Sequence, residues 1–255
     1  MRFHNGWLLC LSIVACAAVT ACTSSNVRRE STLSNEARLR VADAADAAGD
    51  TDLALSMYQA AAASEPSNIA VQLRCADALA RAGKIEQARQ VLTDRRRSGR
   101  HEPDLIRALA LIDLVAGQPA EAIAGFKDVL AINPTDVRTR VDMAVALDLL
   151  GRHAEAQVIY RQVLAATPND PATRNNLAVS MMLEGRTRQA LDTLAPLQDT
   201  DAAPPRVKAN LGILYAATGD AQRSRALLGG SVSESDLLAL TRAMGSSSPE
   251  GHAGP

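Results

Sequence analysis

Residues 141–151 read VDMAVALDLLG, an apolar run with helical spacing that stops at a glycine. The same pattern returns along the chain, because glycines recur every 34 residues at Gly49, Gly83, Gly117, Gly151, Gly185 and Gly219. Five residues after them stand Ala54, Ala88, Ala122, Ala156, Ala190 and Ser224. Nine residues after them stand Tyr58, Leu92, Phe126, Tyr160, Leu194 and Leu228. This constant register predicts six copies of one structural unit.

Each unit is expected to hold two helices. The 14 residues before each glycine form the first helix, and the glycine ends it with a left-handed backbone. The alanine marks the point where the second helix crosses the first closely, and the large residue after it fills the space toward the next unit. Pro196 falls late in a second helix, which predicts that this helix is shortened or bent.

A 34-residue helix–turn–helix unit resembles the tetratricopeptide repeat, over about residues 35–230. The resemblance implies an all-α, right-handed superhelical solenoid of about six repeats. One departure is plain: the family's large aromatic residue at the fourth position of a repeat is replaced by Arg38, Gln72, Ile106, Arg140, Arg174 and Lys208. Ser233 and Asp236 predict the start of a C-terminal capping helix, residues 233–244, before a disordered tail, residues 245–255.

Composition agrees with a helical array. Alanine accounts for 48 of the 255 residues and aromatic residues for only 2%, which argues against a β-rich fold. A hydrophobic content of 47% with 22% charged residues excludes wholesale disorder. The net charge of -1 gives no electrostatic reason to expect nucleic acid as a partner.

The N-terminal residues are expected to form a targeting segment. Residues 1–21 have the basic start and apolar run of a signal peptide, and Val19-Thr20-Ala21-Cys22 resembles a bacterial lipobox. The resemblance implies a lipid on Cys22, a flexible tether over residues 22–34, and a place at the periplasmic face of the outer membrane. Cys16 is a competing lipidation site, and a non-lipidated signal peptide or an anchor helix remains an alternative. Inner-membrane retention also stays open.

No catalytic constellation is found in the sequence. His101, His153 and His252 are scattered, and the chain lacks His-Glu-x-x-His, a phosphate-binding loop and a Gly-x-Ser-x-Gly elbow. Cys75, the one cysteine outside residues 1–22, falls at a helix packing position and is expected to be a buried core residue. We therefore expect no enzyme, no metal, no small-molecule substrate and no cofactor other than the lipid on Cys22.

In the repeat geometry, positions 2, 5, 9, 12 and 13 of the first helices line a concave groove. In repeats four to six these positions form an apolar stripe with a few polar residues, which suits a bound helix or extended peptide. Leu149 and Leu183 belong to it, and the selected candidates for partner binding are Arg138, Val141, Val145, Asp148, Asn175, Val179, Met182, Arg206 and Ile213. For any one of them, packing against a neighbouring helix is an equally open interpretation.

Three stretches suggest a narrower resemblance: residues 145–157 (VALDLLGRHAEAQ), 174–180 (RNNLAVS) and 206–211 (RVKANL). Together with the lipobox they resemble TadD, the repeat lipoprotein family of tight-adherence (Flp) pilus systems. The resemblance implies a pilotin-like, non-catalytic adaptor whose partners are protein components of the pilus machine, the secretin among them. The family's terminal helix is replaced here by Leu237-Leu238-Ala239-Leu240-Thr241. A lipoprotein scaffold for another pilus or for cell-wall synthesis is the alternative.

Overall fold

The computed structural model describes residues 33–96, 102–198, 203–229 and 239. Within these ranges the chain is helical and contains no strand. The helices are α1 (Asn35–Ala47), α2 (Thr51–Ser64), α3 (Ile69–Arg81), α4 (Ile85–Arg96), α5 (Pro103–Val115), α6 (Pro119–Ile132), α7 (Val137–Leu149), α8 (His153–Ala166), α9 (Pro171–Leu183), α10 (Thr187–Leu194), the 3₁₀ turn η1 (Ala195–Leu197), α11 (Pro205–Ala217) and α12 (Ala221–Leu228). The expected all-α repeat architecture is confirmed.

The chain divides into two units, residues 1–65 and 66–255. The first unit contains the hairpin of α1 and α2. Its core holds Ala42, Ala54 and Tyr58, and the Tyr58 hydroxyl donates a hydrogen bond of 2.6 Å to Asp43. At the other end of the hairpin, Arg38 Nη1 donates to Ser64 Oγ at 2.7 Å. Hydrogen bonds therefore join the two helices at the middle of α2 and at its C-terminal end.

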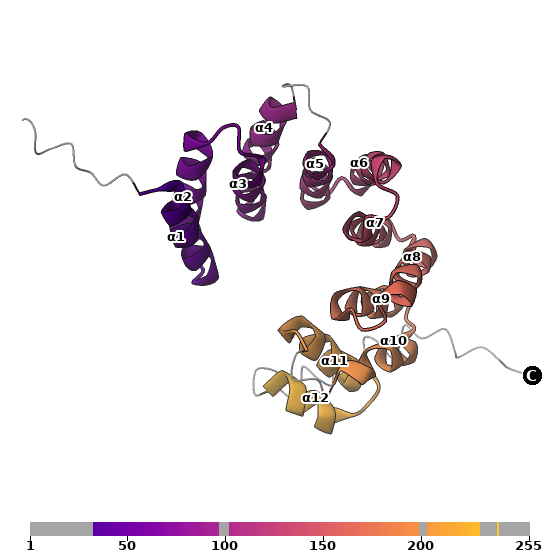
Figure 1. Ribbon diagram of the computed structural model, residues 1–255. Coiled ribbons are helices and arrows are strands. Elements are labelled where there is room, and N and C mark those ends of the chain that lie inside the picture. Colours follow the sequence, from indigo (N-terminus) through magenta and orange to yellow (C-terminus); the bar gives the residue numbers. More distant parts are fainter. Residues whose placement is uncertain (1–32, 97–101, 199–202, 230–238, 240–255) are drawn as a thin grey trace, which may run out of the picture. The chain divides into compact units, whose positions relative to one another are not determined.

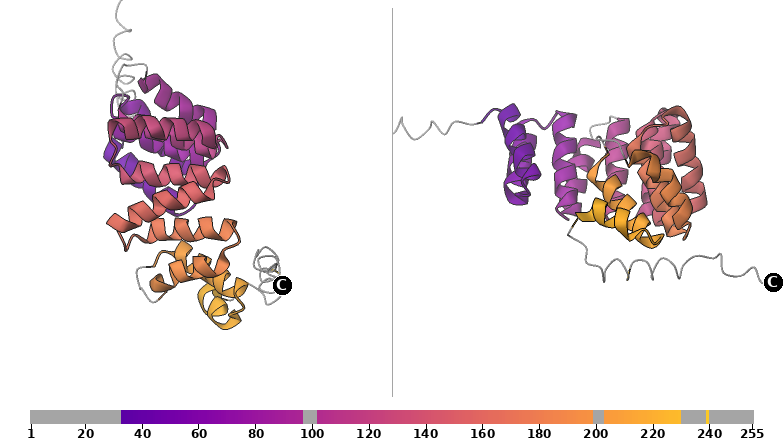
Figure 2. Two further views of the ribbon diagram at one scale, coloured as in Figure 1. Left: turned by 90° about the vertical axis from the view of Figure 1, so that its right-hand side faces the viewer. Right: turned by 90° about the horizontal axis from the view of Figure 1, so that it is seen from below.

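In the second unit, α3 to α12 follow one another along a curve. The odd-numbered helices α5, α7, α9 and α11 lie on its inner side, and α6, α8, α10 and α12 lie on its outer side (Figure 1). Seen from the side, successive helices from α5 onward are stacked one above another (Figure 2). Because each repeat adds one helix to each row, equivalent positions of successive inner helices form rows across the repeats.

The six repeat glycines end the first helix of each repeat as expected. Their φ angles lie between 73° and 87°, a conformation that side chains with a Cβ rarely adopt. The residue after each glycine donates a backbone hydrogen bond to the carbonyl oxygen five residues earlier in the chain. Arg152 N, for example, donates to Leu147 O at 2.9 Å. This is the Schellman arrangement, and it recurs after each of the six glycines. The expected first-helix boundaries are confirmed to within a residue.

The alanine register marks the close crossings of helices. Ala88, Ala122, Ala156 and Ala190 have no exposed surface, and neither has Ser224 in the last repeat. The large residues four positions later are also enclosed, with Leu92, Phe126 and Leu194 at 0% and Tyr160 at 1% exposure. Buried residues of successive repeats pack against one another, so one continuous core runs from Ala110 to Tyr215.

Pro196 has the effect expected of it. Helix α10 ends at Leu194 after 8 residues, and the chain continues as the 3₁₀ turn η1, whereas α6 and α8 each run for 14 residues. No helix among the described residues is long and apolar enough to cross a membrane. The signal segment with Cys16 and Cys22, nearly all of the tether (residues 22–32), all of the capping helix except residue 239, and the tail lie outside the described residues.

Candidate protein-binding surface

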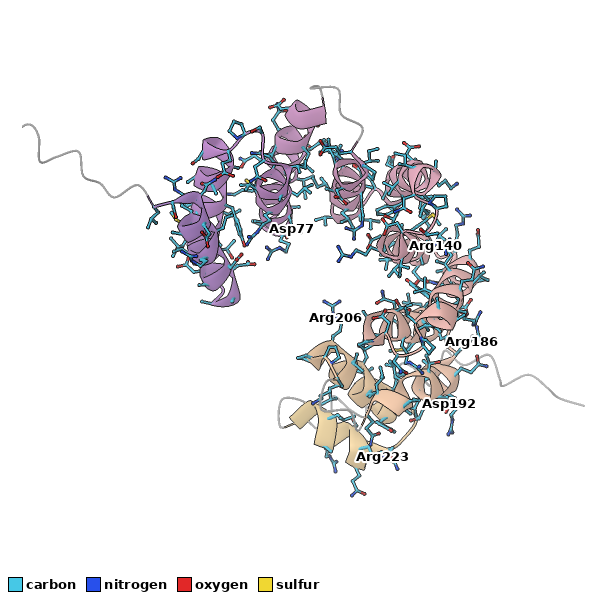
Figure 3. The ribbon with its side chains drawn as sticks, in the orientation of Figure 1. Asp77, Arg140, Arg186, Asp192, Arg206 and Arg223 are labelled. Carbon is cyan, nitrogen blue, oxygen red and sulfur yellow. The ribbon has the colours of Figure 1, made fainter. Side chains whose placement is uncertain are left out.

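The inner side of the curve carries one stripe of side chains from each inner helix. Positions 2, 9 and 13 of a helix lie within about 40° of one another when successive residues turn by about 100°. We call the stripes on α5, α7, α9 and α11 the inner face; its members are Asp104, Leu111, Val115, Arg138, Val145, Leu149, Ala172, Val179, Leu183, Arg206, Ile213 and Ala217. Figure 3 shows Arg206 projecting from the start of α11 into the space inside the curve.

One edge of the inner face is an exposed aliphatic row. Val115, Leu149 and Leu183 stand at position 13 of α5, α7 and α9, and they are 57%, 61% and 60% exposed. Next to this row, Leu111, Val145, Val179 and Ile213 are half-buried and continue the apolar surface toward the middle of each helix. Large aliphatic side chains held in one register over three repeats form an ordered patch, which is the kind of surface that protein partners cover.

The opposite edge is basic. Arg138 and Arg206 occupy position 2 of α7 and α11, and both are exposed. Neither guanidinium group has an ion pair or hydrogen bond with any residue that the structure describes. Asp104 stands at the same position of α5, so the basic edge begins at α7.

Asp148 directly precedes Leu149 in α7, but its carboxylate is occupied by the protein itself. Its carboxylate accepts hydrogen bonds from Ser180 Oγ at 2.6 Å and from the Tyr160 hydroxyl at 3.0 Å, and it lies 2.8 Å from His153 Nδ1. Only 11% of its side chain is exposed. Burial and the neighbouring carboxylate of Asp148 raise the pKa of Tyr160, which therefore stays a donor. Asp148 holds repeats four and five together and is not free for a partner.

Asn175 differs from the expectation in the same way. It is 4% exposed, and its Oδ1 accepts a hydrogen bond of 2.7 Å from Asn210 Nδ2 on α11. A side-chain amide can be buried at low cost only when it is hydrogen-bonded, and Asn210 supplies that bond. Asn175 therefore packs against a neighbouring helix, which is the alternative that the sequence left open for each candidate.

A similar pair joins the preceding inner helices. Arg107 on α5 and Asp142 on α7 form an ion pair of 2.6 Å, with a quarter or less of each side chain exposed. Burial raises the pKa of the Asp142 carboxyl, although the Arg107 guanidinium opposes that shift. Both this pair and Asn175–Asn210 join residues 35 apart in the chain, one more than the repeat length. Polar pairs at this spacing fix the register of one inner helix against the next.

The other candidate residues remain at least partly accessible. Arg138 and Arg206 are exposed, and the apolar candidates Val141, Val145, Val179, Met182 and Ile213 are half-buried. Val115, the first member of the aliphatic row, was not among the residues expected from the sequence, because those candidates came from repeats four to six only. The 34-residue spacing from Leu149 would have found it.

The described residues hold no group of three or more His, Cys, Asp or Glu side chains that could bind a metal ion. Ser180, His153 and Asp148 do meet, but the serine hydroxyl donates to the aspartate rather than to the histidine. In a Ser-His-Asp triad the serine hydroxyl donates to the histidine, so this arrangement is not such a triad. Cys75 is buried, and burial raises the pKa of its thiol.

Models of a known repeat family match most of the described chain. Tetratricopeptide repeat models match residues 47–112, 114–178 and 149–209, and a second repeat model matches residues 205–229. The chain belongs to the tetratricopeptide repeat family. A search of curated proteins finds no significant match.

Solved structures with similar folds include two tetratricopeptide repeat proteins and a pilus biogenesis factor. One from Parabacteroides merdae is 15% identical with a TM-score of 0.66, over 86% of this chain and 87% of that one. TTC0263 from Thermus thermophilus is 18% identical with a TM-score of 0.62, over 71% and 98%. PilW, described as a widely conserved type IV pilus biogenesis factor, is 19% identical with a TM-score of 0.62, over 81% and 98%. At these identities the likeness is one of fold.

Within the tetratricopeptide repeat family this chain has an unusual fourth position. Arg140 stands where the family has a large aromatic residue, and its Nε and Nη2 both donate to the carbonyl oxygen of Pro134, at 3.1 and 2.6 Å. Arg174 likewise donates to Pro168 O at 2.5 Å. The proline carbonyls belong to the turns that end the preceding repeats, so these arginines fasten each turn to the following inner helix.

Proposed function

We propose that this tetratricopeptide repeat chain is a membrane-tethered, non-catalytic adaptor for assembly of a tight-adherence (Flp) pilus machine. In this role Cys22 carries the lipid anchor, the outer membrane is the site of attachment, and the inner face binds a segment of a pilus component. The secretin is the leading partner because the role is pilotin-like.

The observation that carries the adaptor role is the exposed register of Val115, Leu149 and Leu183. Leaving large aliphatic side chains in water is unfavourable, by about 25 cal/mol for each Å² of apolar surface, and a bound partner would remove that cost. Membership of a repeat family that presents extended surfaces supports the same role.

The pilus assignment rests on three supports. The stretches at residues 145–157, 174–180 and 206–211 resemble TadD, and the lipobox places Cys22 where a TadD-type lipoprotein carries its anchor. The fold likeness to PilW adds a pilus biogenesis factor with the same architecture. The alternative function is a lipoprotein scaffold for another pilus or for cell-wall synthesis.

Lipidation is tested by growing cells with radiolabelled palmitate. The wild-type chain is expected to take up label and to fractionate with the outer membrane, whereas Cys22→Ala is expected to do neither. Cys16→Ala is the matched control and should label like wild type. Label that persists in Cys22→Ala and disappears in Cys16→Ala would contradict the assignment of Cys22.

The pilus role is tested by deleting the gene and measuring the amount of assembled secretin in outer-membrane fractions. A loss of assembled secretin that the plasmid-borne wild-type gene restores is expected. Unchanged secretin together with a loss of another pilus or of a cell-wall synthase would favour the alternative scaffold.

A further inference from the structure

The two edges of the inner face differ in chemistry in a way that constrains what binds there. The inner helices run in the same direction, so their position-2 residues share one edge and their position-13 residues share the other. Arg138 and Leu149 on α7 are 11 residues apart, which corresponds to about 16 Å along the helix. A single bound segment therefore meets arginines on one side and aliphatic side chains on the other.

The acids nearest the basic edge are already bonded: Asp136, which caps α7, accepts a hydrogen bond of 2.6 Å from Thr139 Oγ1. Helices α7, α9 and α11 carry two aspartates, and both are already bonded: Asp142 to Arg107 and Asp148 to Ser180 and Tyr160. The arginines at the fourth position, Arg140 and Arg174, are bound to backbone carbonyls. On these three helices the exposed charged side chains are those of Arg138 and Arg206, and both are positive, while Lys208 is half-buried.

The aliphatic edge sets a spacing. Packed helices lie about 8–10 Å apart, so Leu149 and Leu183 present apolar side chains at about that interval. Two turns of an α-helix advance about 10.5 Å over seven residues. An occupant helix that lies across the inner helices therefore meets successive members of the row with residues seven apart.

We infer that the inner face of α7, α9 and α11 binds an acidic amphipathic helix of a partner protein, with carboxylates against Arg138 and Arg206 and heptad-spaced aliphatic residues against Leu149 and Leu183. A helix measures about 10–12 Å across with its side chains, and the long side chains of Arg138 and Arg206 extend toward it to span the rest of the distance between the two edges. This inference rests on the proposed adaptor function and names the chemistry of its partner.

The test uses the full-length, lipid-anchored chain in its own cells. A photo-crosslinking amino acid replaces Leu149, Leu183 or, as the matched control, Val158, which is 50% exposed on the outer helix α8. After irradiation the crosslinked peptide is identified by mass spectrometry. Crosslinks are expected from Leu149 and Leu183 to one partner segment that is rich in Asp and Glu and carries aliphatic residues seven apart. Val158 should give no crosslink to that segment.

Charge-reversal variants distinguish binding of partner carboxylates by Arg138 and Arg206 from non-specific hydrophobic binding. Arg138→Glu and Arg206→Glu should each lower the crosslink yield at Leu183 about tenfold, because each replaces an attraction to the partner's carboxylates by a repulsion. Arg138→Lys keeps the positive charge and should lower the yield by less than threefold. Arg188→Glu, at an exposed position of the outer helix α10, is the control and should leave the yield unchanged.

The captured protein and the captured segment report on different claims. A pilus component with an acidic amphipathic segment supports both the proposed function and this inference, and a cell-wall protein with such a segment supports this inference alone. A neutral or basic segment, a second copy of the chain, the chain's own residues 230–255, lipid only, or no crosslink at Leu149 and Leu183 would overturn it. Charge-reversed variants that crosslink like wild type would also overturn it.

Discussion

Ser180 on α9 donates a hydrogen bond of 2.6 Å to Oδ1 of Asp148 on α7, and the serine has no exposed surface. The bond crosses the junction between the fourth and fifth repeats. Gln157 on α8 extends the connection, because its Nε2 donates to Glu184 Oε2 at 2.8 Å and its Oε1 accepts from Arg186 Nη1 at 2.9 Å. A polar layer thus links α7, α8 and α9 at this junction and helps to fix the register of the two inner helices that carry Leu149 and Leu183.

Replacing the centre of this layer should destabilise the array. Asp148→Ala leaves the donors of Ser180 and Tyr160 without their acceptor inside the protein, at a cost of about 2–3 kcal/mol in the free energy of unfolding. Urea unfolding followed by circular dichroism measures the change. Asp192→Ala, exposed on the outer helix α10 (Figure 3), is the control and should shift stability by less than about 0.5 kcal/mol. Equal stability of Asp148→Ala and the control would mean that the layer contributes nothing.

Gly125 on α6 lies against Ala110 on α5, so a methyl group there should be harmful. A Cβ added at Gly125 would stand 2.9 Å from the Ala110 Cβ, and that atom is fixed to its helix backbone. Gly125→Ala should therefore cost about 1–3 kcal/mol of unfolding free energy, although alanine is the better helix former by about 1 kcal/mol.

A double-mutant cycle isolates the clash at this crossing. Ala110→Gly removes the obstructing methyl group, so the double variant should be less destabilised than the sum of the two single variants. Additive effects in thermal unfolding would show that the close approach of α5 and α6 is not the cause.

Ser224 is expected to destabilise the last repeat relative to alanine. It takes the place of the repeat alanine, is fully buried, and its Oγ has no hydrogen-bond partner among the described residues. Ser224→Ala removes a buried unpaired hydroxyl and is expected to raise the free energy of unfolding by about 1 kcal/mol. The reciprocal change Ala190→Ser, at the same position of repeat five, should lower it. A destabilised Ser224→Ala would indicate that the hydroxyl is hydrogen-bonded in solution.

Cys75 should resist alkylation while the array is folded. Its side chain is 1% exposed, and burial raises the pKa of the thiol, so less thiolate is present at a given pH than in the unfolded chain. A maleimide assay at pH 8 should label Cys75 at least about a hundredfold faster in urea than in buffer. Ser34→Cys, at an exposed position, serves as the positive control. Rapid labelling of Cys75 in buffer would place the thiol at an opening in the array.

The repeat register made most of the fold predictable from the sequence. Gly151 and its equivalents mark where the inner helices end, and Ala156 and Tyr160 mark the crossing and the filled gap. These assignments depend on local backbone geometry and side-chain size, which a single repeat already encodes. The shortening of α10 at Pro196 was predictable for the same reason.

The candidate site was only partly predictable, because burial depends on the neighbouring repeat. Asn175 and Asp148 stand at positions that face the groove in the family, yet each is occupied by a polar residue of the next repeat. A signal existed in the sequence: Arg107 with Asp142 and Asn175 with Asn210 are complementary pairs spaced by 35 residues. A search for polar pairs at one residue beyond the repeat length would have identified these two pairs, but not Asp148, because its partner Ser180 is 32 residues away.

The central claim is that the inner face, and not another surface, recruits a pilus component. Its most direct test is the amount of secretin that co-purifies from cell envelopes with tagged full-length chain. The double variant Leu149→Asp/Leu183→Asp places charge in the aliphatic row, and Val158→Asp places charge on the outer helix α8 at similar exposure. The account predicts at least a tenfold loss of secretin with the double variant and none with Val158→Asp, at roughly equal levels of folded protein. Equal recovery of secretin with all three chains would contradict it.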